Sequence, residues 1–298
     1  FFKQKTAYEI YQCDWSSDVC SSDLTSLKSI YTHQIIDQES LLRPIVKWTT
    51  TIAAKNAFDQ VRKGIAIARQ SMPGPVHFNV PTDVAAAEQP ESKRFAPAGV
   101  RTLPRRDDRG PIEALLKKAR RPLALVGVGV QIDGAERELK RFLEAWRIPF
   151  ICTYKAKGVV PEDHPLCAGA TGLSPVVDKL HMAQVREADL ILTIGFDPVE
   201  LRADWIAPWD EKKPSVNIDL VPNLHHVFRS SYEYAGSILG CLHALTAPAP
   251  KRPPSKWLDV DVDRYRRTVQ HAIESTPDRK STRLNSSHTD ISRMPSSA

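Results

Sequence analysis

The segment RPLALVGVGV, from Arg121 to Val130, decides the fold of this chain. Its apolar run LALV lies between Pro122 and the turn Gly127-Val-Gly129, and this pattern predicts a short strand that is buried on both faces. The segment ADLILTIG, from Ala188 to Gly195, has the same character. Strands of this kind are typical of parallel sheets whose two faces are covered by helices.

Helical and strand patterns alternate in the residues around these two segments. We expect helices at 111–120, 134–146 and 176–187, and strands at 123–126, 149–153, 189–194 and 215–219. This alternation predicts an α/β fold with a parallel, Rossmann-like sheet. In open sheets of this class, ligands bind outside the carboxyl ends of the strands, so we look for functional residues there.

A smaller α/β unit precedes this sheet. Residues 44–52 have the β-branched content of a strand, residues 53–70 have apolar side chains at helical spacing, and residues 76–80 again predict a strand. The turn Pro73-Gly-Pro75 ends the helix. Polar stretches rich in Pro and basic residues at 89–110 and 248–277 predict linkers.

Both ends of the chain resemble translated sequencing adapter. KQKTAYEI (3–10) and DWSSDVCSSDL (14–24) resemble one reading frame of an adapter, and DRKSTRLNSSH (278–288) and SRMPSSA (292–298) resemble its reverse complement. In that frame residues 10–13 admit ATATCAGT, and residues 289–291 admit ACTGATAT, which is its reverse complement. We therefore expect residues 1–24 and 278–298 to be non-native, and residues 25–277 to be an open piece of a longer gene.

Composition excludes several classes of function. The net charge is +6, but the basic residues are dispersed and have no interleaved aromatic residues, so we expect no nucleic-acid partner. No apolar run reaches the roughly 18 residues of a membrane span, so we expect no membrane partner. Cys152, Cys167 and Cys241 are far apart and form no CxxC pair, which favours reduced thiols and a cytoplasmic location.

Residues that follow the predicted strands are the candidate ligand contacts. Gly127 and Gly129 follow the first strand of the Rossmann-like unit, where backbone amides can hold a phosphate. The dinucleotide fingerprint GxGxxG is incomplete because Ile132 occupies the third glycine position, so a tight structural turn is an equal alternative. Asp219 ends the segment SVNID, where a carboxylate can accept hydrogen bonds from a ribose or cap the next helix.

Other polar residues favour simpler interpretations. Asp197 and Arg202 follow the strand at 189–194, where they either bind a polar ligand or pair with each other. His164, His225 and His226 lack partners at metal-ligand spacing, so we expect turn and surface roles for them and no metal site. The chain contains no nucleophile elbow, Walker loop or HExxH motif.

Longer segments resemble a known family. HQIIDQESLLRPIVKW (33–48) and GPVHFNVPTDV (74–84) are similar to the second half of the pyrimidine-binding domain of thiamine diphosphate-dependent enzymes of the acetolactate synthase and benzoylformate decarboxylase group. RPLALVGVGV, IPFICTYKAKGVVPEDHPLCAGATG (148–172), ADLILTIG and VNIDLVP (216–222) resemble the central domain of that family. The resemblance assigns residues 25–88 to the end of the pyrimidine-binding domain and residues 111–247 to the central domain.

This resemblance implies a function. The parent protein would be a lyase or transferase that uses thiamine diphosphate and Mg²⁺, acts on a 2-oxo acid as a decarboxylase or carboligase, and assembles as a homodimer or homotetramer. Gln34 and Lys47 would lie at the active site or its entrance. If the central domain binds FAD or another nucleotide, as in some relatives, the matching positions are Gly127, Gly129, Thr153, Gly195, Asp197 and Asp219.

The same resemblance identifies what the chain lacks. The family's catalytic glutamate would lie before Thr25 and its GDG-to-Asn diphosphate-binding segment would lie after Pro277, so we expect the chain alone to be inactive. Two alternatives remain, a nucleotide-binding module without catalysis and a NAD-dependent deacylase of the sirtuin type. The second is disfavoured because Cys152, Cys167 and Cys241 cannot supply paired CxxC zinc ligands.

Overall fold

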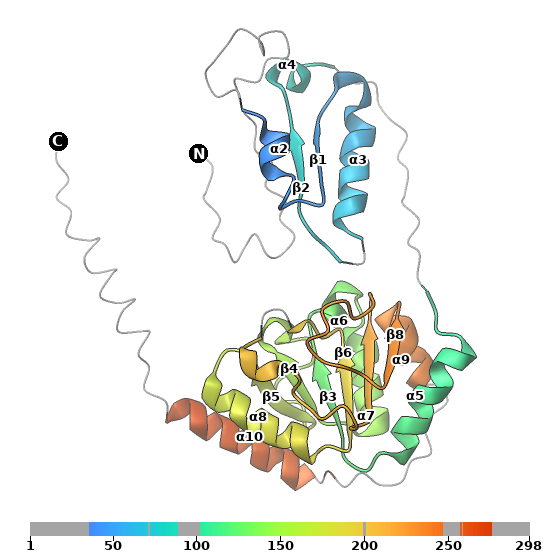
Figure 1. Cartoon of the computed structure of the whole chain (residues 1–298), viewed down its shortest axis with the longest axis vertical. Coiled ribbons are helices and arrows are strands. Elements are labelled where there is room, and N and C mark those ends of the chain that lie inside the picture. Colours follow the sequence, from blue (N-terminus) through green and yellow to red (C-terminus); the bar gives the residue numbers. More distant parts are fainter. Residues whose placement is uncertain are drawn as a thin grey trace, which may run out of the picture. The chain divides into compact units, whose positions relative to one another are not determined.

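The computed structural model describes residues 36–70, 72–88, 102–198, 201–246, 257 and 259–275. The chain divides into two compact units, Phe1–Val100 and Arg101–Ala298 (Figure 1). The adapter-like segments 1–24 and 278–298 lie outside the described residues, as do Gln34 and most of the first predicted linker.

The first unit contains the predicted strand–helix–strand arrangement. Its elements are α2 (Gln38–Leu42), β1 (Trp48–Thr51), the 3-10 turn η1 (Ala54–Asn56), α3 (Ala57–Ala68), β2 (Val76–Asn79) and α4 (Thr82–Ala85). β1 and β2 pair in parallel, and α3 packs on β2 where Gly64 meets the ring of Phe78. Phe58, Val61 and Ile65 of α3 are 38–40% exposed, so this helix keeps an uncovered apolar face.

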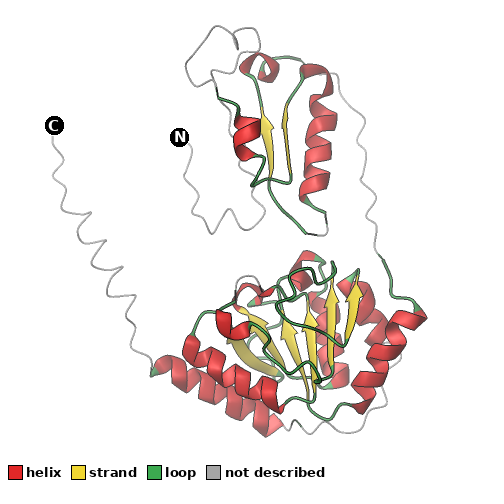
Figure 2. Ribbon diagram, viewed as in Figure 1, coloured by secondary structure: helices red, strands yellow, loops and turns green. Residues whose placement is uncertain are grey.

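The second unit is built on one parallel sheet of six strands (Figure 2). The strands are β3 (Pro122–Val126), β4 (Phe150–Thr153), β5 (Cys167–Thr171), β6 (Leu190–Ile194), β7 (Ser215–Asp219) and β8 (Tyr232–Ala235). Their order in the sheet is β5-β4-β3-β6-β7-β8, and every neighbouring pair is parallel. The chain therefore changes direction across the sheet between β3 and β6, which confirms the predicted Rossmann-like fold.

Helices cover one face of this sheet. They are α5 (Arg106–Lys118), α7 (Glu136–Trp146) and α9 (Ile238–Thr246). α7 buries Leu139, Phe142, Leu143 and Trp146, which lie three or four residues apart and so form one apolar stripe. The indole Nε1 of Trp146 donates to the carbonyl of Leu245 at 3.0 Å, which joins α7 to α9.

The opposite face is covered by two helices and two long connections. The helices are α8 (Pro175–Glu187) and α10 (Asp259–Glu274), which lie side by side in Figure 1. The β6–β7 and β7–β8 connections add an aromatic cluster made of Phe196, Trp205, Trp209 and Phe228. In the β6–β7 connection the described residues include the 3-10 turn η4 (Ala203–Trp205) and no α-helix, where a regular crossover would place one.

Several elements of the second unit differ from the sequence prediction. α5 begins at Arg106, inside the predicted linker 89–110, because the carboxylate of Asp108 accepts the backbone N–H of Arg105 at 2.9 Å and caps the helix. β5 lies in a segment that we had expected to be a loop. β8 and α9 were not predicted.

The second predicted linker, 248–277, also requires correction. Its described residues include α10, which packs on α8 and β5. The indole Nε1 of Trp257 donates to the carbonyl of Pro122 at 2.8 Å, and Val262 and Val269 are buried. α10 therefore belongs to the folded unit, because its apolar side chains cover the end of the sheet that carries β5.

Candidate functional site

The carboxyl edge of the six-stranded sheet brings the predicted contacts together. Gly127 follows β3, Thr153 ends β4, Gly195 follows β6 and Asp219 ends β7. Gly129 begins the short helix α6 (Gly129–Ile132) and Asp197 lies in the loop after Gly195. Since all the strands are parallel, these six residues share one edge, although the sequence separates them by up to 92 positions (219 − 127).

Three glycines form the centre of this edge. A Cβ atom at Gly127 would lie 2.1 Å from the carbonyl oxygen of Gly195, and one at Gly129 would lie 2.6 Å from the Cα of Gly195. Gly195 itself has φ +57°, which side chains rarely adopt. These residues therefore allow the loops after β3 and β6 to pack backbone against backbone.

The N–H groups of this turn already have partners. The N–H of Gly127 donates to the carbonyl of Ile194 at 3.0 Å, and that of Gly129 donates to the carbonyl of Gly195 at 2.9 Å. The N–H groups of Val130 and Gln131 donate to the carbonyls of Gly127 and Val128. A phosphate at this turn would therefore compete with protein carbonyls, and the geometry accounts for the glycines by packing alone.

Two carboxylates lie near each other at the ends of β6 and β7. The pKa of Asp219 is raised from 3.8 to about 6, mainly by burial and in part by the nearby Asp197. The N–H of Leu220 donates to Asp219 Oδ1 at 2.6 Å and opposes this shift. His225 also faces Asp197: burial lowers its pKa, and Asp197 opposes that shift. The edge thus concentrates negative charge that a hydroxyl-bearing or cationic group would stabilise.

We expect Asp219→Asn to change the pH dependence of stability. The pKa of Asp219 is raised in the folded state, so the folded protein gains stability relative to the unfolded chain as the pH falls from about 6 to 3.8. The variant should therefore be more stable than the wild type by about 3 kcal/mol at pH 7.5, and the difference should vanish near pH 4. Urea denaturation at both pH values measures it.

Asp204→Asn is the matched control for that comparison, because Asp204 is an exposed carboxylate in the connection that precedes β7. A difference between wild type and Asp219→Asn that is equal at pH 7.5 and pH 4 would contradict the assigned cause.

The sequence did not reveal a buried carboxylate beside this edge. Asp178, in α8, is fully buried, and its Oδ1 accepts the hydroxyl of Thr171 at 2.6 Å and the N–H of Gly172 at 2.8 Å. Its Oδ2 lies 3.9 Å from Nε of Arg202, so Arg202 pairs with Asp178. Thr171 is the register partner of Thr153, so Asp178 fixes the end of β5 beside that predicted contact.

Lys47 lies in the first unit, directly before β1. Its ammonium donates to the carbonyl of Met72 at 2.7 Å, and its aliphatic chain lies against Gly74. It is therefore placed at the amino end of the two-stranded sheet, where it holds the turn before β2. Gln34, predicted to act with it, lies outside the described residues.

The histidines that we predicted to be structural make local hydrogen bonds. Nδ1 of His164 accepts the N–H of Leu166 at 3.2 Å, and Nδ1 of His225 accepts the N–H of Val227 at 3.1 Å. His226 adopts a left-handed backbone with φ 51°. Cys152, Cys167 and Cys241 are buried free thiols, and burial raises the pKa of Cys152 and Cys241 to about 12.

A doubly wound parallel sheet with polar residues and glycines at its carboxyl edge defines a Rossmann-like domain. Residues 112–245 match the family model for the thiamine pyrophosphate enzyme central domain. For these residues the match confirms the resemblance to thiamine diphosphate-dependent enzymes found in the sequence.

Individual relatives agree with this assignment. A probable acetolactate synthase large subunit of Methanocaldococcus jannaschii is 35% identical over 171 residues, which is 54% of this chain and 28% of that protein. A glyoxylate carboligase of Escherichia coli O157:H7 is 28% identical over 193 residues, 63% of this chain and 32% of that protein. The chain thus spans about a third of the length of these curated relatives.

A solved structure shows the same fold. It is a putative thiamin diphosphate-dependent enzyme from Mycobacterium smegmatis, with a TM-score of 0.60 and 22% sequence identity. The superposition covers 80% of this chain and 46% of that one.

Proposed function

We propose that this chain is part of a thiamine diphosphate- and Mg²⁺-dependent enzyme that acts on 2-oxo acids, as a decarboxylase or as an acetolactate synthase-like carboligase. The observation that carries the proposal is the match of residues 112–245 to the central domain of that family, on a six-stranded parallel sheet. Bound thiamine diphosphate supplies the carbon nucleophile and the electron sink for such a reaction.

The described part of this chain does not fit the diphosphate end of the cofactor. Among those residues no three His, Cys, Asp or Glu side chains are grouped so that they can hold a metal ion. We therefore derive no catalytic step from these residues, and we propose for residues 25–88 the role of the end of the pyrimidine-binding domain, with Gln34 and Lys47 near the entrance of the active site.

We expect the 298-residue chain by itself to show no 2-oxo acid turnover. The physical reason is that its described residues contain no group of three or more His, Cys, Asp and Glu side chains that could hold the Mg²⁺ of the Mg²⁺-diphosphate group. The measurement is pyruvate consumption with thiamine diphosphate and Mg²⁺, against a blank that contains free cofactor, together with calorimetric titration of the cofactor. Turnover above the blank, or saturable cofactor binding, would contradict the expectation.

A nucleotide contact at the carboxyl edge is a second candidate for the central domain. FAD is the proposed ligand, and Gly127, Gly129, Thr153, Gly195, Asp197 and Asp219 are its proposed contacts. The position of Asp219 at the end of β7 supports it, whereas the paired N–H groups of Gly127 and Gly129 oppose it. A titration of FAD in the same calorimeter distinguishes this module from a purely structural domain. The sirtuin-type alternative is not pursued, because residues 112–245 match a different family.

Assembly of the parent enzyme as a homodimer or homotetramer is also part of the proposal. The exposed apolar residues Phe58, Val61 and Ile65 support the presence of a covering partner for α3 in the parent protein. A cytoplasmic location stays a prediction. In the part of the chain that the structure describes, no helix is long and apolar enough to cross a membrane.

A further inference from the structure

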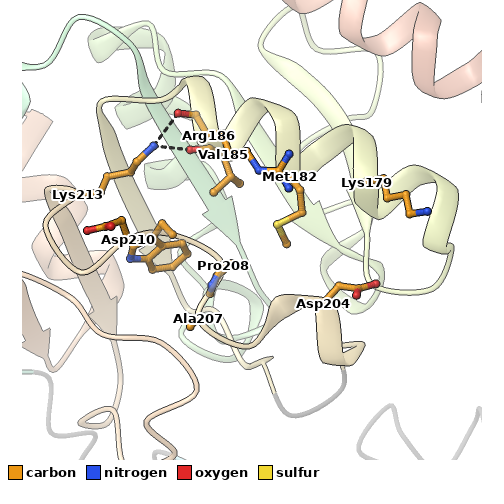
Figure 3. A pocket seen from close by; sticks show the side chains of 10 residues that line it. Lys179, Met182, Val185, Arg186, Asp204, Ala207, Pro208, Asp210 and Lys213 are labelled. Atoms are coloured by element: carbon orange, nitrogen blue, oxygen red, sulfur yellow. Dashed lines mark hydrogen bonds between the residues drawn. The ribbon is translucent and has the colours of Figure 1, made fainter.

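A groove runs along the outer side of α8, on the sheet face that α8 and α10 cover (Figure 3). It lies between α8 and the β6–β7 connection and has a volume of about 960 Å³. This is near the upper end of the range of about 300–1,000 Å³ for small-molecule sites. None of the residues predicted from the sequence to contact a ligand lines it. The groove is lined by Lys179, Met182, Val185, Arg186, Asp204, Ala207, Pro208, Trp209, Asp210 and Lys213.

The floor of the groove is apolar and fixed. Met182, Val185 and Trp209 are 8%, 0% and 8% exposed. The indole Nε1 of Trp209 donates to the carbonyl of Arg229 at 3.1 Å, and its ring packs on that of Phe228 with centroids 5.3 Å apart. The thioether of Met182 and the fixed indole ring of Trp209 form a surface on which a planar or branched apolar group can pack.

The α8 side of the groove carries two cations without partners. Lys179 and Arg186 are seven residues apart, two helical turns, and so lie on the same side of α8. Among the described residues the side chain of neither forms an ion pair or a hydrogen bond. The ammonium of Lys213 differs, because it donates to the carbonyls of Val185, Arg186 and Ala188 at 2.7–2.8 Å. Lys213 therefore caps the carboxyl end of α8. At that end of the groove Arg186 is the cation that can bind an anionic ligand.

The charges on the opposite side limit the kind of ligand. Figure 3 shows Asp204 at the same end of the groove as Lys179, whereas Asp210 and Lys213 lie at the other end. Asp210 is engaged, since its Oδ1 accepts the N–H of Lys212 at 2.8 Å. A second anionic group would meet Asp204 at the Lys179 end, so the groove suits a ligand with a single negative charge near Arg186.

Backbone strain marks the same place. Ala207, on the rim of the groove, has φ 46°, and its N–H donates to the carbonyl of Val227 at 2.9 Å. A residue other than glycine in this region costs of order 1–3 kcal/mol and persists where the surroundings hold it. The hydrogen bond to Val227 holds the connection in this conformation at the rim of the groove.

We propose that this groove binds a small organic monocarboxylate with an aromatic or branched apolar body. The body packs on Met182 and Trp209, and the carboxylate is bound by Arg186, whose planar guanidinium matches it in two-point geometry. This site is separate from the carboxyl edge, so the inference does not depend on the proposed enzymatic function.

Phenylacetate is the probe for the test, and the indole N–H resonance of Trp209 is the reporter, assigned with Trp209→Phe in the full chain. We expect phenylacetate to shift this resonance saturably, and we expect Arg186→Gln to weaken the apparent affinity at least tenfold. Arg137→Gln is the matched control, because Arg137 is an exposed arginine on α7, on the opposite face of the sheet. It should leave the affinity unchanged.

Phenethylamine, which has a similar body and the opposite charge, should not shift the Trp209 resonance at the same concentrations. The proposal is overturned if phenylacetate leaves this resonance in place, if Arg186→Gln binds as tightly as the wild type, or if phenethylamine binds equally well. Circular dichroism of each variant establishes that the fold is retained, and Lys179→Gln provides a second variant, expected to weaken binding less than Arg186→Gln.

Discussion

Gly127→Ala should destabilise the second unit by at least about 3 kcal/mol, in the upper part of the range for overpacked sites. The added Cβ would lie 2.1 Å from the carbonyl oxygen of Gly195 and 2.6 Å from the Cα of Phe196. Both contacts are with backbone, so no side-chain rotation relieves them. The loops after β3 and β6 would have to separate, which breaks the hydrogen bonds that join them. Urea denaturation followed by tryptophan fluorescence measures the loss.

Gly110→Ala is the control for this substitution. Gly110 lies in α5 and, apart from its chain neighbours, nothing lies within 4 Å of its Cβ position, so alanine should change the stability by no more than about 1 kcal/mol. Gly195→Ala should resemble Gly127→Ala, because its φ is +57° and its Cβ would lie 2.5 Å from the nitrogen of Val130. If Gly127→Ala unfolds at the same urea concentration as the wild type, the loops do not pack as described.

The wild-type protein should lose about 3 kcal/mol of its free energy of unfolding on acidification because of His181, and His181→Gln should remove this loss. The value is the difference between the unfolded and folded pKa of His181 at roughly 1.4 kcal/mol per pKa unit. His181 is fully buried on α8, and its Nε2 lies 3.4 Å from the carbonyl oxygen of Ala168. Burial lowers its pKa from 6.5 to about 4, and the Ala168 carbonyl and Asp178 oppose the shift.

The sign of this effect follows from proton binding. Between pH 6.5 and 4 the unfolded chain binds a proton at His181 that the folded protein does not, so the free energy of unfolding falls as the pH falls. Denaturation midpoints at pH 7.5 and 4.5 should therefore differ less in His181→Gln than in the wild type. His243→Gln, on the exposed surface of α9, is the control. Equal pH slopes in His181→Gln and the wild type would show that His181 is not the group responsible.

Asp219 and His181 act in opposite directions over much the same pH range. The raised pKa of Asp219 adds stability as the pH falls below about 6, whereas the lowered pKa of His181 removes it. The wild-type protein can therefore show a shallow pH dependence that hides both groups. Each single variant exposes the contribution of the other, which is why the two predictions are best measured together.

Local patterns were sufficient for the main strands and for the position of the candidate site. The apolar runs at 123–126 and 189–194 correspond to β3 and β6, and SVNID corresponds to β7. The parallel arrangement then placed Gly127, Gly195 and Asp219 at one edge. By contrast, β5 (CAGAT) contains Ala and Gly, and β8 (YEYA) contains Glu and Ala. These residues are depleted in strands, so the assignment of both strands depended on their pairing with β4 and β7.

By itself, the sequence determined the α/β class and the edge at which a ligand contact was to be sought, because periodicity and short apolar runs are properties of neighbouring residues. Its longer segments also carried the resemblance to a family. Only the tertiary structure decided that Arg202 pairs with Asp178 and that α10 packs on β5. It also decided that Gly127 and Gly129 meet Gly195 backbone to backbone. These features depend on groups that are distant in the sequence, and their packing is set by distances that no local pattern contains.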